Sequence, residues 1–315
     1  MNLSQLASST GAPTTDHENV THEFPNLIRV YKDGHVERLF GNETVPPGTD
    51  PRTNVQSKDV TINSDTGVSA RLYLPPNTSP NQKLPLLIYI HGGAFCICTP
   101  FNPGYHIHMN NLSALANVAI VSVHYRLAPE TPIPGCYDDS WESIQWAAKH
   151  VSGNGPEPWL NSHADFGRVF FAGDSAGANI AHNMAMRIAD EVGPGGLTLN
   201  GIVLACPYFG GEEEDKLVKF LFPGYVGVDD SKIHCWKDPK LSGLGCKRVM
   251  IFVGGLDVLN ERGRRYYEAL KKSGWSGSVE IDETEGEDHC FHLFKPAGEK
   301  SVALVQKFVH FMKQT

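Results

Sequence analysis

The 315-residue sequence lacks several features that mark membrane-bound, secreted or nucleic-acid-binding proteins. No stretch approaches the ~18 uncharged apolar residues that a membrane-spanning helix requires. The N-terminal segment contains neither a basic start nor an apolar run, so it predicts no secretory signal. The net charge of −8 gives no electrostatic reason to expect a nucleic acid or an anionic membrane as a partner. We therefore expect a cytoplasmic protein that acts on a small molecule.

Sequence motifs for cofactors are also missing. There is no phosphate-binding loop, no G-x-G-x-x-G after a strand and no H-E-x-x-H, so we predict no cofactor and no metal. His106 and His108 are close in sequence, but no third ligand lies near them. The cysteines are odd in number and have no C-x-x-C spacing, which predicts free thiols packed in the core of a protein from a reducing compartment. They are Cys96, Cys98, Cys136, Cys206, Cys235, Cys246 and Cys290.

Short apolar runs alternate with helix-like segments over more than half of the chain. Runs such as LLIYI and VMIFVGG are apolar at every position, which is typical of strands buried on both faces of a parallel sheet. This alternation predicts one α/β domain over residues 26–315, with a mostly parallel eight-stranded sheet flanked by helices. The predicted strands are 57–62, 70–74, 86–90, 119–123, 169–172, 202–205, 249–253 and 279–282. The predicted helices are 138–150, 176–190, 261–272 and 299–313.

Two regions depart from this rhythm. Residues 1–25 are polar and predict a flexible tail, after which residues 27–31 and 36–39 flank Lys32-Asp33-Gly34 as a small hairpin. Residues 210–240 contain an acidic run and an aromatic stretch but no clear strand. We expect residues 26–55 and 210–240 to form a cap over the carboxyl ends of the strands, where open α/β sheets place their sites.

The most specific motif is Gly173-Asp174-Ser175-Ala176-Gly177, which directly follows a strand and opens a helix. In this context G-x-S-x-G is typical of a nucleophile elbow. The turn is so tight that the positions two residues from Ser175 require glycine. The alternative is a glycine-rich turn whose serine only caps the helix.

A second motif, His91-Gly92-Gly93-Ala94-Phe95, directly follows the strand LLIYI. Acyl transfer passes through an oxyanion, which needs backbone N–H groups directed at it. Such a loop, together with the N–H of Ala176 after the nucleophile, is the arrangement expected for this fold. The alternative is a plain Gly-Gly turn. We expect His91 to shape its own loop through backbone hydrogen bonds rather than to carry protons.

A serine nucleophile needs a base, and the base needs an acid to orient it. The chain order Ser, acid, His points to Asp257, at the end of the strand in GGLDVL, and His289, after the last strand in EGEDHCFH. His292 is the rival base, and Asp288 is expected to be a solvated turn residue. Behind the site, we expect Arg126 to pair with Asp138 or Asp139, and His124 to be structural.

The motifs HGGAF, YRLAPE, GDSAGANIAHNMAMR, GGLDVL and GEDHCFHL occur in this order. From about Leu27 to the C-terminus the chain thereby resembles the plant carboxylesterases of the hormone-sensitive-lipase-like α/β-hydrolase group. The resemblance implies an α/β-hydrolase fold with a helical cap and hydrolysis of carboxylic esters through an acyl-enzyme. It implies that Ser175 is the nucleophile, Asp257 the acid and His289 the base. The implied oxyanion donors are Gly92, Gly93 and Ala94, with Ala176.

The resemblance also leaves other functions open. HGGAF, with Ala94 in place of a third glycine, looks like the version in 2-hydroxyisoflavanone dehydratases, although these carry threonine at the position of Ser175. Gibberellin receptors and alkaloid cyclases of the group lack the catalytic histidine, whereas His289 is present here. We expect a serine carboxylesterase. The alternatives are a dehydratase, transesterase or cyclase of specialised metabolism, and a non-catalytic receptor for a small hormone.

Several side chains near these motifs are predicted to line a substrate pocket, with core packing as the alternative for each aromatic one. They are Phe95, Tyr105, Asp174, Tyr208, Phe209, Phe220 and Phe222.

Overall fold

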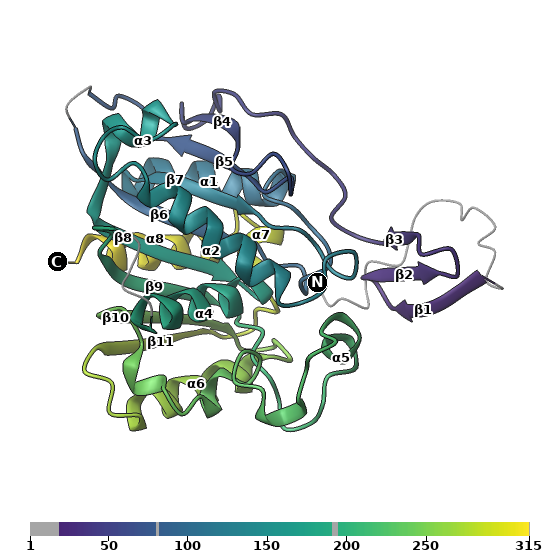
Figure 1. Cartoon of the computed structure of the whole chain (residues 1–315). Coiled ribbons are helices and arrows are strands. Elements are labelled where there is room, and N and C mark those ends of the chain that lie inside the picture. Colours follow the sequence, from purple (N-terminus) through teal and green to yellow (C-terminus); the bar gives the residue numbers. More distant parts are fainter. Residues whose placement is uncertain (1–18, 80–81, 191–194, 315) are drawn as a thin grey trace.

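The structure is a computed structural model that describes residues 19–79, 82–190 and 195–314. At its centre is an eight-stranded sheet with the order β11-β10-β9-β8-β6-β7-β5-β4 (Figure 1). All neighbouring strands are parallel except that β5 runs antiparallel to both β4 and β7. The strands are β4 (Gln56–Thr61), β5 (Ser69–Leu74), β6 (Leu84–Ile90), β7 (Ala119–His124), β8 (Ala164–Asp174), β9 (Leu199–Ala205), β10 (Arg248–Gly254) and β11 (Ser278–Thr284). The mostly parallel sheet predicted from the apolar runs is thus confirmed.

Helices cover both faces of the sheet. Helices α2 (Gly135–Ala148), α4 (Ala176–Asp190) and α6 (Asn260–Lys272) lie in front of it in Figure 1, whereas α1 (Pro103–Ala116) and α8 (Glu299–Lys313) lie behind it. The two layers explain why the central strands are apolar throughout, since the side chains of both faces are buried. Among the helices of the described residues, none combines the length and the apolar character needed to cross a bilayer.

The predicted helices at 176–190, 261–272 and 299–313 match α4, α6 and α8 closely, and α2 begins three residues before its predicted start. Helix α1 was not predicted. Its signals are local: the Asn102 side chain accepts the N–H of Gly104 at 3.0 Å, and Pro103 occupies the first turn. The short helix α3 (Pro158–His163) likewise begins with a capping residue, Glu157, and a proline.

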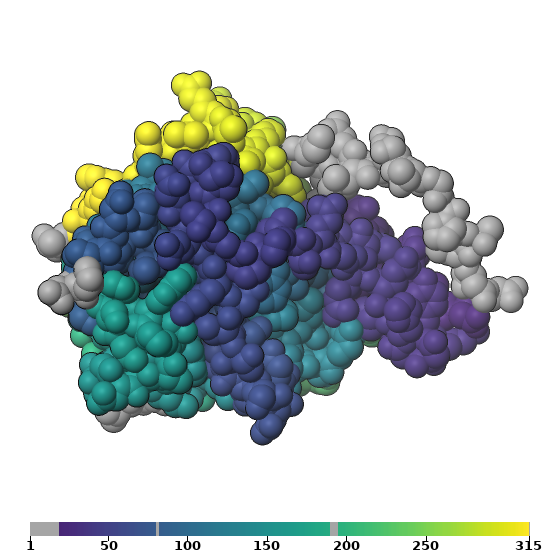
Figure 2. Space-filling model, turned by 90° about the horizontal axis from the view of Figure 1, so that it is seen from above, coloured from purple at the N-terminus to yellow at the C-terminus, as the bar shows by residue number. Residues whose placement is uncertain are grey.

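The N-terminal segment forms a separate three-stranded antiparallel sheet of β1 (Val20–Phe24), β2 (Ile28–Tyr31) and β3 (Val36–Arg38). The predicted hairpin is the β2–β3 pair. The predicted flexible tail was too long, because residues 20–24 are a strand paired with β2; residues 1–18 lie outside the described part. Figure 2 shows this purple segment projecting beyond the body of the molecule.

Residues 210–240 contain helix α5 (Lys216–Leu221) and short 3-10 turns, but no strand. The Asp215 side chain caps α5 by accepting the N–H groups of Leu217 and Val218. The Phe220 ring lies 4.5 Å from the ring of His22 and 5.3 Å from that of Phe24, so α5 packs against β1. The two segments therefore meet at the edge of the molecule on the right of Figure 1.

Candidate active site

The predicted nucleophile lies in a sharp turn between β8 and α4. Ser175 has a φ of 51°, a left-handed conformation that is uncommon for a residue other than glycine. A Cβ at Gly173 would lie 2.4 Å from the backbone of Gly177, and a Cβ at Gly177 would lie 2.0 Å from the carbonyl oxygen of Ile90. Glycine is therefore required at both flanking positions, which is the geometry expected of the elbow.

Three side chains from distant parts of the chain meet at this turn. His289 Nε2 lies 2.9 Å from Ser175 Oγ, and His289 Nδ1 lies 2.8 Å from Asp257 Oδ2. Asp257 follows β10 and His289 follows β11, so all three residues come from loops at the carboxyl ends of parallel strands. Because a carboxylate only accepts, Nδ1 donates to Asp257, and in the neutral imidazole Nε2 is left to accept the serine proton. The second oxygen of Asp257 accepts the N–H of Leu259 at 2.8 Å.

The environment favours a proton on His289. Burial disfavours the charged imidazolium, but the hydrogen bond to Asp257 and the nearby Cys206 and Asp174 outweigh burial. Together they raise the pKa of His289 to about 9. The N–H of His289 donates to Asp288 Oδ1 at 2.7 Å, so Asp288 fixes the backbone of this loop.

The rival base, His292, does not reach the serine. Its ring is buried and packs edge-on against His108, with the ring centroids 5.0 Å apart. Burial and the neighbouring histidines lower the pKa of His292 well below its usual value, so it stays neutral. Within the described part of the chain, the geometry brings His289 rather than His292 to Ser175.

The HGGAF loop follows β6 and has three consecutive positive φ values: 104° at Gly93, which glycine adopts freely, and 51° at Ala94 and 65° at Phe95, which are uncommon for such residues. The backbone N–H of Gly92 is not free, because it donates to the Tyr105 hydroxyl at 2.8 Å. The prediction that Gly92 donates to an oxyanion is therefore wrong in this structure. No hydrogen-bond partner is found within the described residues for the N–H groups of Gly93, Ala94 and Ala176.

A buried carboxylate supports this loop from below. Asp174 Oδ1 accepts the Tyr89 hydroxyl at 2.9 Å and Oδ2 accepts the Tyr105 hydroxyl at 2.8 Å. Burial raises the pKa of Asp174, and the two tyrosine hydrogen bonds oppose that shift. Asp174, Tyr105 and Gly92 thus form a chain of hydrogen bonds that joins the elbow to the HGGAF loop. Sequence reasoning missed Tyr89, which sits inside an apolar strand and carries no motif.

The surroundings of the loop match two further expectations. His91 stacks on Tyr125 with the ring centroids 4.2 Å apart, and its Nδ1 lies 2.7 Å from the carbonyl oxygen of Gly92. Burial lowers the pKa of His91 to about 3, so the ring is neutral. Arg126 pairs with Asp139 at 2.6 Å, as one of the two predicted alternatives. His124 lies 3.0 Å from the Ser69 hydroxyl, a structural contact.

The aromatic residues proposed for a pocket divide into three groups. Phe209 is fully buried against His182 and Tyr266, which makes it a core residue and contradicts the prediction. Tyr105 and Asp174 act in the support of the loop. The remaining rings are Phe95, Tyr208 and Phe222, which are buried, and Phe220, which contacts β1. Phe95 packs on Tyr208, and Phe222 packs on Tyr225.

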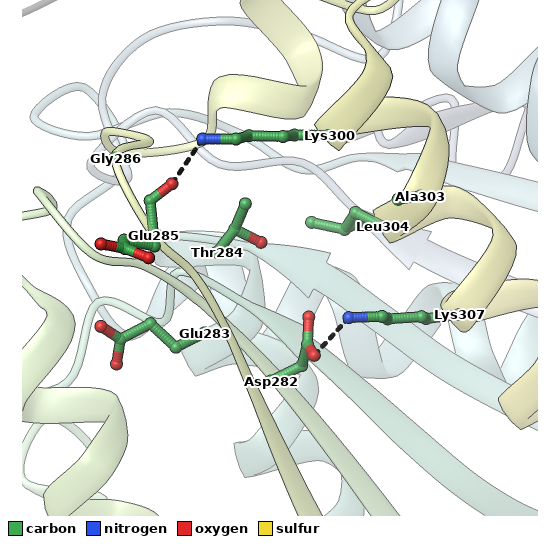
Figure 3. A pocket seen from close by; sticks show the side chains of 9 residues that line it. All are labelled: Asp282, Glu283, Thr284, Glu285, Gly286, Lys300, Ala303, Leu304 and Lys307. Carbon is green, nitrogen blue, oxygen red and sulfur yellow. Dashed lines mark hydrogen bonds and ion pairs between the residues drawn. The ribbon is translucent and has the colours of Figure 1, made fainter.

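Two cavities lie near the carboxyl edge. One of about 410 Å³ lies between β11 and α8, and Figure 3 shows Lys307 directed at Asp282 and Lys300 directed at the backbone of Glu285. Lys307 pairs with Asp282, Lys300 donates to the carbonyl oxygen of Glu285, and Glu283 pairs with Arg264. This cavity holds none of the three converging side chains. Another, of about 450 Å³, is lined by Tyr105 and by the apolar side chains of Phe40, Leu293 and Phe294.

The seven cysteines are all buried and unpaired, as predicted. Two of them, Cys206 and Cys290, lie beside His289.

Comparison with known protein families matches residues 87–293 to a family described as alpha/beta hydrolase fold. The chain belongs to the α/β-hydrolase fold family. The matched range includes Ser175, Asp257 and His289. The fold class and the family resemblance predicted from the motifs are thereby confirmed.

This α/β hydrolase is similar over most of its length to plant proteins. It is 41% identical to a 2-hydroxyisoflavanone dehydratase from Glycyrrhiza echinata, over 98% of this chain and 100% of that protein. It is 45% identical to probable carboxylesterase 2 from Arabidopsis thaliana, over 94% of this chain and 98% of that protein. Among solved structures, it superimposes on a hyperthermophilic esterase from Pyrobaculum calidifontis with a TM-score of 0.65 at 25% identity, over 82% and 85% of the two chains.

Proposed function

We propose that this α/β hydrolase is a serine carboxylesterase that hydrolyses small carboxylic esters. The observation that carries the proposal is the unbroken hydrogen-bond chain from Asp257 through His289 to Ser175. The carboxylesterase and esterase names among the similar proteins agree with it.

The reaction proceeds in two halves. His289 Nε2 removes the Ser175 proton as Oγ attacks the ester carbonyl, and Asp257 stabilises the imidazolium that forms. The carbonyl oxygen becomes an oxyanion, which the N–H groups of Gly93, Ala94 and Ala176 stabilise. The imidazolium then protonates the departing alcohol and leaves an acyl-serine. Water, activated by the same imidazole, attacks the acyl-serine and releases the acid.

Ser175→Ala tests this scheme. Wild type is expected to give a burst of chromophore from a chromogenic acetate or butyrate, followed by steady turnover. Ser175→Ala is expected to lose both, with kcat reduced by roughly 10⁴-fold or more. Ser152→Ala, at an exposed position between α2 and α3, is the matched control and should keep wild-type rates. Equal turnover by Ser175→Ala and wild type would refute the proposal.

A second candidate activity is dehydration of a 2-hydroxyisoflavanone, and related transesterification or cyclisation of specialised metabolites belongs to the same group. The identity of 41% to a protein named 2-hydroxyisoflavanone dehydratase and the HGGAF loop favour it. Incubation of the purified enzyme with 2-hydroxyisoflavanones, followed by chromatography, decides the question. Formation of the dehydrated isoflavone would support this activity, and recovery of the substrate unchanged would exclude it.

The third alternative, a non-catalytic hormone receptor, is disfavoured because His289 lies within hydrogen-bond distance of Ser175. Stoichiometric labelling of Ser175 by an organophosphate would weigh against a receptor, whereas tight gibberellin binding without ester turnover would favour it.

We further propose that residues 26–55 and 210–240 cap the site. Arg38 supports this role, since it pairs with Glu130 at 2.7 Å and donates to the carbonyl oxygen of Cys96 beside the HGGAF loop. The cap would select small molecules as substrates.

A cytoplasmic location remains our prediction from the sequence, and imaging of a fluorescent fusion in plant cells would test it.

A further inference from the structure

Two thiols flank the imidazole of His289. Cys206 follows β9, Cys290 follows His289 in sequence, and the ligand atoms of these three residues lie within 4.8 Å of one another. The side chain of His289 is 21% exposed, whereas Cys206 and Cys290 are 1% and 4% exposed. The cluster is therefore a buried pair of thiols behind an imidazole that solvent reaches.

The backbone holds both thiols in place. Cys206 and Cys290 have φ values of 46° and 49°, conformations that are uncommon for residues other than glycine. The N–H of Cys206 donates to the carbonyl oxygen of Phe252 at 2.7 Å, and the N–H of Cys290 donates to Cys206 Sγ at 3.3 Å. Strained backbone of this kind persists only where the surrounding structure fixes it, and it is concentrated at functional sites.

We propose that Cys206, Cys290 and His289 form a binding site for a thiophilic divalent cation of the Zn²⁺ type, and that its occupation inhibits the enzyme. Two thiolates and one imidazole are a donor set that Zn²⁺ accepts readily, with metal–ligand bonds of about 2.0–2.3 Å and a fourth position open to water. On binding near neutral pH, the two S–H bonds and the N–H bond at the ligating nitrogen of the His289 imidazolium break. Two metal–sulfur bonds and one metal–nitrogen bond form, and three protons leave to solvent. No electron is transferred, and the dication neutralises the two thiolates.

Inhibition follows from the position of His289. Both ring nitrogens already serve the hydrogen-bond chain, with Nδ1 at 2.8 Å from Asp257 and Nε2 at 2.9 Å from Ser175. A cation bound through either nitrogen replaces one of these hydrogen bonds. Metal binding and activation of Ser175 are therefore mutually exclusive. The inhibitory consequence rests on the proposed function, whereas the binding itself does not.

Binding is tested directly with Cd²⁺, which reports thiolate ligation through an ultraviolet charge-transfer band. Wild-type protein purified in the presence of a chelator and then freed of it is expected to give a band that saturates at one Cd²⁺ per chain. Cys206→Ser and Cys290→Ser should each weaken binding at least tenfold. Cys246→Ser, which removes a buried thiol between β9 and β10, is the matched control and should bind like wild type.

Thermal unfolding of each variant shows whether it is folded, and Cys206→Ala provides a second replacement if the serine variant is not. The proposed site would be overturned if wild-type protein gave no charge-transfer band with Cd²⁺. It would also be overturned if the band persisted in the Cys206→Ser/Cys290→Ser double variant. These outcomes do not depend on esterase activity, so they separate failure of the site from failure of the proposed function.

The inhibitory consequence is tested on wild type alone. Zn²⁺ should slow labelling of Ser175 by an organophosphonate at least tenfold, and a chelator should restore the rate. Because coupling between two sites is reciprocal, the phosphonate adduct on Ser175 should in turn weaken the binding of Cd²⁺. This holds where the adduct accepts a hydrogen bond from His289 and so keeps the imidazole from the metal. Labelling that proceeds at the same rate with saturating Zn²⁺ would show that occupation does not engage His289, and it would overturn the inhibitory role.

Discussion

At the scale of single residues, the Tyr105 hydroxyl connects the elbow to the loop that would receive the oxyanion. It accepts the N–H of Gly92 and donates to Asp174, so it fixes the direction in which the next two amides point. The sequence analysis placed Tyr105 in a substrate pocket. The sequence does not show whether the ring or the hydroxyl of a tyrosine near a motif is the functional part. The hydroxyl, rather than the ring, performs the positioning role here.

Replacing this hydroxyl should affect the rate more than substrate binding. Tyr105→Phe leaves the Gly92 N–H without a partner and leaves Asp174 Oδ2 with only the thiol of Cys290 as a donor, which costs about 1–3 kcal/mol of stability. We expect kcat to fall roughly tenfold or more, with KM little changed, because an oxyanion donor acts mainly in the transition state. Tyr89→Phe is the matched control: it removes the other hydrogen bond to Asp174 but leaves Gly92 untouched. Equal losses of kcat in the two variants would contradict a specific role for Tyr105.

The titration of His289 sets the pH dependence of the free enzyme. Its pKa is raised to about 9, and the base must be neutral to accept the serine proton. We therefore expect kcat/KM, measured with a chelator present, to rise with pH and to level off above about pH 9.

Asp257→Asn removes the negative charge, and with it the charge-assisted hydrogen bond, that raise the pKa of His289. The rise of kcat/KM with pH, called here the rising limb, should therefore move to lower pH in this variant. At the same time kcat should fall by about 10⁴-fold. Asp288→Asn keeps an acceptor for the N–H of His289 and should leave the limb in place. A limb that is unchanged in Asp257→Asn would show that another group controls it.

At the scale of elements, strands with continuous apolar runs could be predicted from the sequence. Strands that form only because they pair with a neighbouring strand could not. Strand β10 reads VMIFVG in its apolar part, and its burial on both faces leaves little choice of structure. Strand β1, VTHEF, exposes its three central residues and forms because β2 pairs with it. Phe95 and Phe209 are both buried in the fold, although in the sequence either ring could equally line a pocket.

The elbow is the element most sensitive to a single methyl group. Gly177→Ala places a Cβ 2.0 Å from the carbonyl oxygen of Ile90, a contact between two backbones that cannot rotate away. We expect a loss of about 3 kcal/mol in the free energy of unfolding, measured by urea denaturation. Gly48→Ala, whose Cβ would meet nothing within 4 Å, should change stability little. A Gly177→Ala variant as stable and active as wild type would contradict the geometry of the turn.

At the scale of the whole molecule, the N-terminal sheet and helix α5 meet through Phe220, whose ring contacts His22 and Phe24. If these segments cap the site, Phe220→Ala should loosen both. We expect faster proteolysis within residues 19–40 and a higher KM, with a smaller change in kcat. Leu115→Ala, an exposed position on α1, is the control. Unchanged proteolysis and KM in Phe220→Ala would argue against a joint cap.

The place of residues 210–240 in the chain, between β9 and β10, also bears on how substrate specificity can differ among α/β hydrolases of this kind. Strands β9 and β10 pair directly with each other in parallel register, although this long insert separates them in sequence. Their ladder constrains the two ends of the insert and leaves its interior free to vary. Exchanging this segment between relatives would therefore change the proposed cap while Ser175, His289 and Asp257 keep their places, which makes it a natural position for loop grafting in the laboratory.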